Sequence, residues 1–142
     1  MKFIKNIFKL FQTENEWENS LIFQNSKTDF LIILKDIENT LRNGQHDGQA
    51  VVVERISDTL LKNDYLKFKK EINSIDMWGG SGAVWEVYFH DNDLQRKFNS
   101  KMLKLIDLME RTKILGRGIK PLKELFKNNT SDKSPIRCES SL

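Results

Sequence analysis

The sequence contains few of the residues that cross-link or interrupt a chain. Among its 142 residues there are one cysteine, Cys138, and two prolines. A single thiol excludes an intramolecular disulfide and a cysteine-based zinc cluster, and such poverty in cysteine is typical of a reducing compartment. Long apolar runs are also missing, since no stretch approaches the roughly 20 residues that span a bilayer. We therefore expect a cytoplasmic protein without a membrane span.

The first residues do not look like a signal peptide. Residues 1–11 mix basic and apolar side chains, with neither a continuous apolar core nor a small-residue cleavage site. Two interpretations of this amphipathic segment stay open, because it can pack onto the domain or touch a membrane surface. One short cationic helix anchors weakly, so we favour packing onto the domain.

The overall composition is that of a globular domain. Hydrophobic residues make up 39% and charged residues 30% of the chain, a balance that supports a core and excludes a wholly disordered protein. The length suits one domain better than two. We expect residues 1–127 to form a single helical domain and residues 128–142 to form a disordered polar tail.

Apolar residues recur at helical spacing through most of this domain. The clearest case is Phe30, Leu34, Ile37 and Leu41, which follow one another at steps of four, three and four. Similar patterns predict helices over residues 27–43, 49–61, 65–75 and 93–113, and a short one after Pro121.

Polar residues at the predicted helix starts support this assignment. Asp64 and Asn92 are expected N-caps, with Gln95 completing a capping box at the second site. The predicted fold class is mainly α: a single-domain bundle of four to six helices, interrupted by a glycine-rich loop. Only residues 83–89, rich in aromatic and β-branched side chains, have a composition that also suits a short strand.

The glycine-rich loop is the segment Gly-Gly-Ser-Gly at residues 79–82. Each glycine would cost about 1 kcal/mol in a helix interior, so the segment must turn. Its spacing matches neither a P-loop nor a dinucleotide-binding fingerprint. Trp78 and Trp85 flank it. We favour a tight structural turn, and keep a partner-contact loop and an anion site as alternatives.

Catalytic and metal sites are not indicated by residue spacing. His46 and His90 each precede an aspartate, and the two pairs could supply ligands to a small metal-dependent hydrolase. Adjacent residues rarely bind one ion together, and both pairs fall at predicted helix boundaries, where polar loops are expected. Ser81 has glycine amides beside it but no recognisable base. We therefore expect no enzymatic activity, no metal and no cofactor.

Charge is segregated along the chain, although the net charge is only +3. Acids outnumber bases between residues 12 and 93, and bases outnumber acids between residues 94 and 127. The basic positions are Lys97, Lys101, Lys104, Arg111, Lys113, Arg117, Lys120, Lys123 and Lys127. Such a stretch could bind phosphate backbones in a nucleic-acid-associated accessory protein. An ordinary solvated helix face shows the same pattern, and we favour that interpretation.

The segment Met-Trp-Gly-Gly-Ser-Gly-Ala-Val-Trp-Glu-Val at residues 77–87, followed by a long predicted helix, resembles small bacterial proteins with a Gly-Gly-x-Gly segment. Some of these resemble immunity proteins that neutralise secreted polymorphic toxins. The resemblance covers roughly residues 28–113. It implies a non-catalytic inhibitor, which needs only a rigid surface with anchors and charge complementary to its target.

The acidic middle of the chain would supply that charge, because toxic nucleases tend to be basic. We expect a protein partner, in this interpretation a toxin, with nucleic acid as the alternative and no small-molecule ligand. The candidate partner-binding residues are Trp17, Asp36, Glu38, Asp47, Glu54, Asp58, Trp78, Gly79, Gly80 and Ser81.

Overall fold

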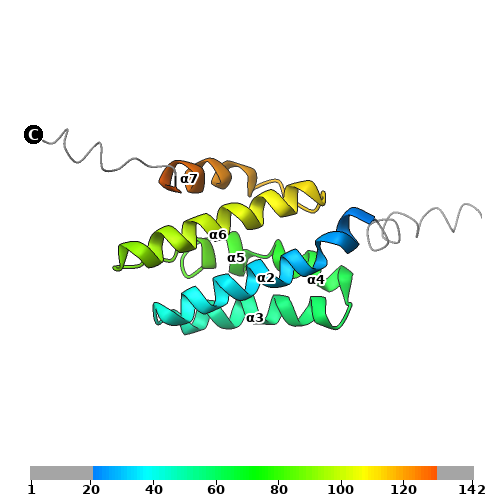
Figure 1. Ribbon diagram of the computed structural model, residues 1–142, viewed down its shortest axis with the longest axis horizontal. Coiled ribbons are helices and arrows are strands. Elements are labelled where there is room, and N and C mark those ends of the chain that lie inside the picture. The colour runs from blue at the N-terminus through cyan, green and yellow to red at the C-terminus, as the bar shows by residue number, and fades with distance from the viewer. Residues whose placement is uncertain (1–20, 131–142) are drawn as a thin grey trace, which may run out of the picture.

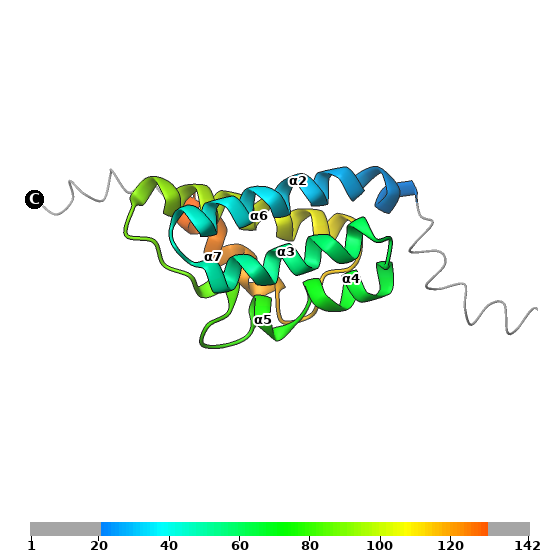
Figure 2. The ribbon, with the colours of Figure 1, turned by 90° about the horizontal axis from the view of Figure 1, so that it is seen from below.

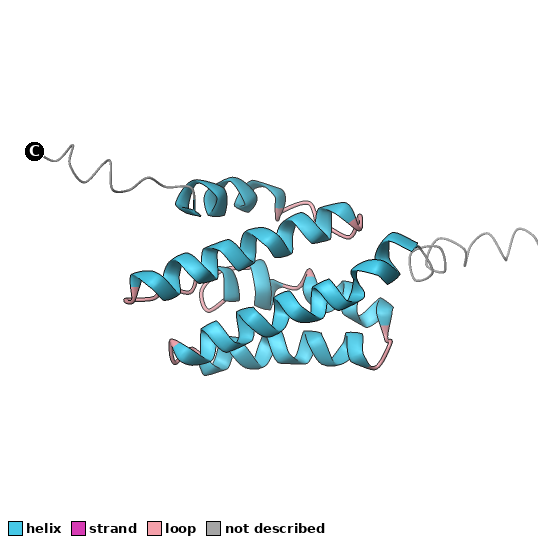
Figure 3. Ribbon diagram, viewed as in Figure 1, coloured by secondary structure: helices cyan, strands magenta, loops and turns pink. Residues whose placement is uncertain are grey.

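The computed structural model describes residues 21–130, which form helices joined by turns and contain no strand (Figure 3). The elements are α2 (Leu21–Asn43), α3 (Asp47–Leu61), α4 (Tyr65–Ile72), α5 (Ile75–Trp78), the 3-10 helix η1 (Val84–Glu86), α6 (Asn92–Arg111) and α7 (Lys120–Thr130). The predicted fold class, a mainly α single-domain bundle, is confirmed. None of the described helices is long and apolar enough to cross a membrane.

The helices are arranged around α2. This helix packs between α3 and α6, and α7 lies on the outer side of α6 (Figure 1). Seen from the α3 side, α4 and α5 line the edge of α3 that faces away from α2 (Figure 2). The chain thus places the α3 side and the α7 side at opposite ends of the stack.

The core follows the predicted apolar spacing. All four members of the stripe from Phe30 to Leu41 are fully buried. Phe23, two turns before Phe30, is buried as well and stacks edge-on to Tyr65, with ring centroids 5.2 Å apart. Because Phe23 continues the same helical face, the described part of α2 includes residues before the predicted start at residue 27.

The third predicted helix is broken in two. α4 ends at Ile72, because the Asn73 side chain donates to the Lys69 carbonyl oxygen at 2.8 Å and to that of Ile114 at 2.9 Å. α5 begins only after Ser74. The long-range bond to Ile114 ties this break to the chain beyond α6, and an expectation based on local spacing does not include such a bond.

The start of α6 also differs from the prediction. Asp91, and not Asn92, is the N-cap: its carboxylate accepts from the backbone N–H of Asp93 at 2.8 Å and of Leu94 at 3.0 Å. Gln95 forms no capping box. Its Oε1 instead accepts from the backbone N–H of Phe89 at 2.8 Å, which anchors the incoming chain to the helix.

Residues 83–89 form no strand. Instead the chain makes successive turns: the Ala83 N–H donates to the Gly80 carbonyl oxygen at 3.0 Å and the Glu86 N–H to that of Ala83 at 3.2 Å, and Val84–Glu86 form η1. Beyond the predicted domain end at residue 127, α7 continues to Thr130. The rest of the expected tail and the amphipathic segment 1–11 lie outside the described residues.

Candidate functional site

One candidate surface is the solvent-facing side of α3, which we call the α3 stripe. It consists of five residues at helical spacing that are all exposed: Asp47, Val51, Glu54, Asp58 and Leu61. Val51 is 48% exposed and Leu61 60%. The stripe therefore combines three carboxylates with two apolar side chains that the protein itself does not cover, which is the mixture expected of a protein-binding surface.

Two of the three carboxylates carry uncompensated charge. Within residues 21–130, neither Asp47 nor Asp58 has an ion-pair partner, whereas Glu54 lies 3.2 Å from Arg42. Arg42 also donates to Glu38 at 3.0 Å. That bond raises the pKa of Arg42, with further contributions from the charges of Glu38, Glu54 and Asp47. The stripe thus carries two carboxylates, those of Asp47 and Asp58, that no described basic side chain pairs.

The other two predicted acids do not belong to this surface. Glu38 is only 4% exposed, and both Arg42 and Lys35 from its own helix contact it. Asp36 forms an ion pair with Lys101 of α6 at 3.0 Å. These carboxylates lie on α2 and are compensated there. The Glu38–Arg42 pair has the i, i+4 spacing that a sequence reveals.

The glycine loop is fastened at both ends by the flanking tryptophans. Trp78 Nε1 donates to the Ile72 carbonyl oxygen, and Trp85 Nε1 donates to that of Gly79, both at 2.7 Å. A β-carbon on Gly79 would lie 2.6 Å from the Ile75 carbonyl oxygen, and Gly82 has a φ of +89°. The loop is therefore a structural turn. Both half-buried indoles use their N–H groups in hydrogen bonds within the protein.

The tip of this turn nevertheless reaches the α3 side. Residues 80–82 are exposed, and the Gln49 side chain of α3 donates to the Gly82 carbonyl oxygen at 3.1 Å. Asp47 lies two residues before Gln49 in the same first turns of the helix. The structure thus brings Gly80 and Ser81 next to the beginning of the α3 stripe, while Trp78 stays at the base of the turn.

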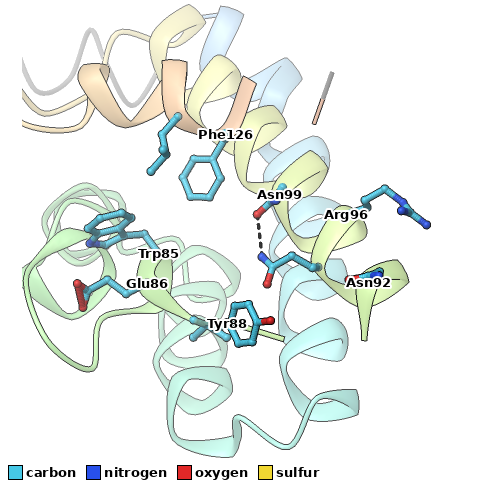
Figure 4. Close-up of a pocket in the computed structure, with 10 residues that line it drawn as sticks. Trp85, Glu86, Tyr88, Asn92, Arg96, Asn99 and Phe126 are labelled. Atoms are coloured by element: carbon cyan, nitrogen blue, oxygen red, sulfur yellow. Dashed lines mark hydrogen bonds between the residues drawn. The ribbon is translucent and has the colours of Figure 1, made fainter. Parts of the chain in front are cut away.

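A second surface feature is a groove between the segment 85–88, α6 and α7 (Figure 4). Its volume is about 700 Å³. The residues that line it are Trp85, Glu86, Val87, Tyr88, Asn92, Gln95, Arg96, Asn99, Leu125 and Phe126. The lining contains three aromatic residues and three side-chain amides. The groove is absent from the sequence-based prediction because its walls are distant in sequence.

The two histidines come together, but in a structural role. Both line a shallow hollow beside the turn between α2 and α3. His46 Nε2 lies 3.0 Å from the Tyr88 carbonyl oxygen, and its ring stacks edge-on to Phe89 with centroids 5.1 Å apart. Within residues 21–130 no group of three or more His, Cys, Asp or Glu side chains is placed to hold a metal ion.

The basic stretch is partly neutralised by acids of the same bundle. Lys123 contacts Asp107 at 2.9 Å and Glu110 at 2.7 Å, in addition to the Lys101–Asp36 pair. The hydrogen bonds to these acids raise the pKa of Lys123 well above its usual range. These lysines therefore join helices to one another, and a nucleic-acid interface would depend on the remaining bases.

Trp17, the remaining predicted partner-binding residue, lies outside the described residues. Comparison of the chain with protein-family models, with curated proteins and with solved structures finds no match.

Proposed function

We propose that this protein is a non-catalytic binding protein of the immunity type, which inhibits a basic protein toxin through the α3 stripe. The observation that carries the proposal is the pairing of free charge with uncovered apolar surface. Asp47 and Asp58 have no ion-pair partner within residues 21–130, and Val51 and Leu61 stand exposed on the same face. The resemblance of residues 77–87 to Gly-Gly-x-Gly proteins supports the immunity role.

The stripe has the physical properties that such inhibition requires. Its carboxylates would attract a positively charged partner and accelerate encounter. Val51 and Leu61 would then be buried in the complex and supply affinity, since apolar area removed from water stabilises by about 25 cal/mol per Å². α3 is a rigid support, because its opposite face is fully buried at Ala50, Val53 and Ile56. Little ordering of the backbone would therefore oppose binding.

The direct test is capture from the native host with matched charge variants. The tagged chain should retain a basic protein, and co-expression of the chain should abolish that protein's toxicity. The double variant Asp47→Lys, Asp58→Lys should weaken the complex at least tenfold, about 1.4 kcal/mol, in isothermal titration. Glu124→Lys is the control for each of the two single reversals, because it makes the same change of net charge at an exposed position of α7.

Two results would contradict the proposal. One is recovery of nucleic acid alone, released by salt and unaffected by the α3 variants, which would favour the basic stretch instead. The other is equal loss of binding in the α3 variant and the Glu124→Lys control, because net charge and not the stripe would then be responsible.

A further inference from the structure

The groove of Figure 4 has walls of two kinds. Trp85 stands on one side and Phe126 of α7 faces it from above, while Tyr88 closes the lower end (Figure 4). Tyr88 is 66% exposed and Leu125, beside Phe126, is 43% exposed. Nothing in the fold requires these two side chains to be uncovered. Together they form an apolar chamber, open to solvent, that can hold one large apolar side chain.

Side-chain amides of fixed orientation form the third wall. The Phe89 backbone N–H donates to Gln95 Oε1, so the Gln95 amide cannot be reversed. Gln95 Nε2 therefore donates to Asn99 at 3.1 Å, and the Asn99 atom that receives this bond must be Oδ1. Asn99 Nδ2 is left without a hydrogen-bond partner within the described residues, although the side chain is only 6% exposed.

The oriented N–H donor of Asn99 implies a ligand with a hydrogen-bond acceptor. Asn99 Nδ2 is not one of the described buried atoms that are cut off from water, so it reaches water in the groove. A ligand that covers it must supply an acceptor oxygen in place of that water, because a donor left without a partner is unfavourable. The acceptor most common in proteins is the peptide carbonyl group. The position of Asn99, deep between the aromatic walls, suits a backbone carbonyl whose neighbouring side chain occupies the chamber.

The charge of the groove selects among ligands that have such an acceptor. Arg96, its only base, forms an ion pair with Asp93 of its own helix. Glu86 is exposed and has no ion-pair partner within residues 21–130. Glu86 is therefore the charged lining residue without an ion-pair partner in the described part of the chain, and its carboxylate favours a lysine or arginine over a phosphate group.

From these features we infer that the groove binds an extended peptide segment carrying a large apolar side chain two residues from a lysine or arginine. The spacing of two follows from extended geometry, in which alternate side chains share a face. The apolar side chain lies among Trp85, Tyr88 and Phe126, a backbone carbonyl accepts from Asn99, and the basic side chain pairs with Glu86. The groove shares no residue with the α3 stripe, so the two proposals can fail independently.

The test is a titration of the full chain, labelled with ¹⁵N, with synthetic peptides. The probe is acetyl-Ala-Phe-Ala-Lys-Ala-amide, and the matched peptides replace Lys by Glu or Phe by Ala. The probe should shift the side-chain amide signals of Asn99 and Gln95 and the indole signal of Trp85 saturably, with a dissociation constant of about 1 mM or tighter, the scale of a few well-placed contacts. Each matched peptide should bind at least fivefold more weakly.

Variants of the exposed groove residues and of the buried Asn99 separate binding from folding. Glu86→Gln should remove the preference for Lys over Glu in the peptide. Tyr88→Ala and Leu125→Ala should weaken binding several-fold. Asn99→Asp, which keeps an oxygen toward Gln95 and replaces the free donor by an acceptor, should weaken it most. Leu66→Ala, at an equally exposed position of α4 outside the groove, should change nothing.

Four outcomes would overturn the inference. Peptide shifts that do not saturate would show that the groove is not a peptide site. So would shifts that are the same in Glu86→Gln and in Asn99→Asp as in the unsubstituted chain. Saturable shifts with oligouridine and none with the peptide would assign it to nucleic acid. Groove signals that change with protein concentration alone would assign it to a second copy. Signals that change when residues 131–142 are removed would assign it to the chain's own C-terminal segment.

Discussion

Gly44 and Phe89 pack so closely that only a hydrogen fits between them. A β-carbon at Gly44 would lie 2.5 Å from Cε2 of the Phe89 ring. The turn after α2 is thereby pressed against the segment that leads into α6, and the His46 ring covers Phe89 from the adjoining side. The first glycine after α2 thus carries a tertiary contact as well as ending a helix.

This contact predicts opposite effects for two neighbouring glycines. Gly44→Ala should lower the free energy of unfolding by about 1–3 kcal/mol, the usual cost of overpacking. Gly48→Ala should raise it by about 0.5–1 kcal/mol, because an added β-carbon there meets no atom within 4 Å and lies in the first turn of α3. Urea unfolding measures both. A Gly44→Ala protein as stable as Gly48→Ala would contradict the prediction, and stabilisation by both would show that the Phe89 ring moves aside.

The indole of Trp85 is predicted to hold the glycine turn. In Trp85→Phe the Gly79 carbonyl oxygen loses the one side-chain donor that it has among residues 21–130, the indole nitrogen at 2.7 Å, and stability should fall by about 1–3 kcal/mol. Tyr88→Phe is the matched control, since the Tyr88 hydroxyl has no hydrogen-bond partner in the described part of the chain. Thermal unfolding of the two variants tests this. A Trp85→Phe protein as stable as Tyr88→Phe would contradict it.

Acid should loosen the attachment of α7 to α6. The hydrogen bond from Lys123 and its charge lower the pKa of Glu110. A carboxyl with a lower pKa in the folded state stabilises fully above its unfolded pKa, and this stabilisation is lost as pH falls through the folded value. The loss should therefore occur below pH about 4. In Lys123→Gln it should be smaller, as urea unfolding at several pH values would show. A steeper loss in that variant would contradict the assignment.

The helices could be predicted from sequence because each buries one face of regular spacing. Phe30, Leu34, Ile37 and Leu41 define the inner side of α2 without reference to any other element. Errors arose where a tertiary bond decided the outcome. Asn73 ends α4 by reaching the Ile114 carbonyl oxygen, 41 residues away. No local pattern contains that partner.

The candidate surfaces were predictable to different degrees. Asp47, Glu54 and Asp58 share a face because they lie on one helix, so spacing alone groups them. The compensation of Asp36 by Lys101 depends on the packing of α2 against α6. The groove is the hardest of these surfaces to predict from sequence, because Glu86, Asn99 and Phe126 meet only once three segments have packed. The free Asn99 donor depends in addition on a backbone N–H from Phe89.

The two walls of the groove differ in how firmly they are held, because one of them is α7. It packs chiefly on α6, whereas α6 packs on α2 as well. An element held by one neighbour opens at a lower free energy than one buried in the core, so α7 should exchange its amide hydrogens before the rest of the bundle does. The wall that carries Phe126 should then open transiently, while the wall that carries Trp85 stays in place. A ligand bound between the two walls would slow amide hydrogen exchange in α7. The exchange rate of α7 amides would therefore show whether the groove is occupied, even for amides that do not line it.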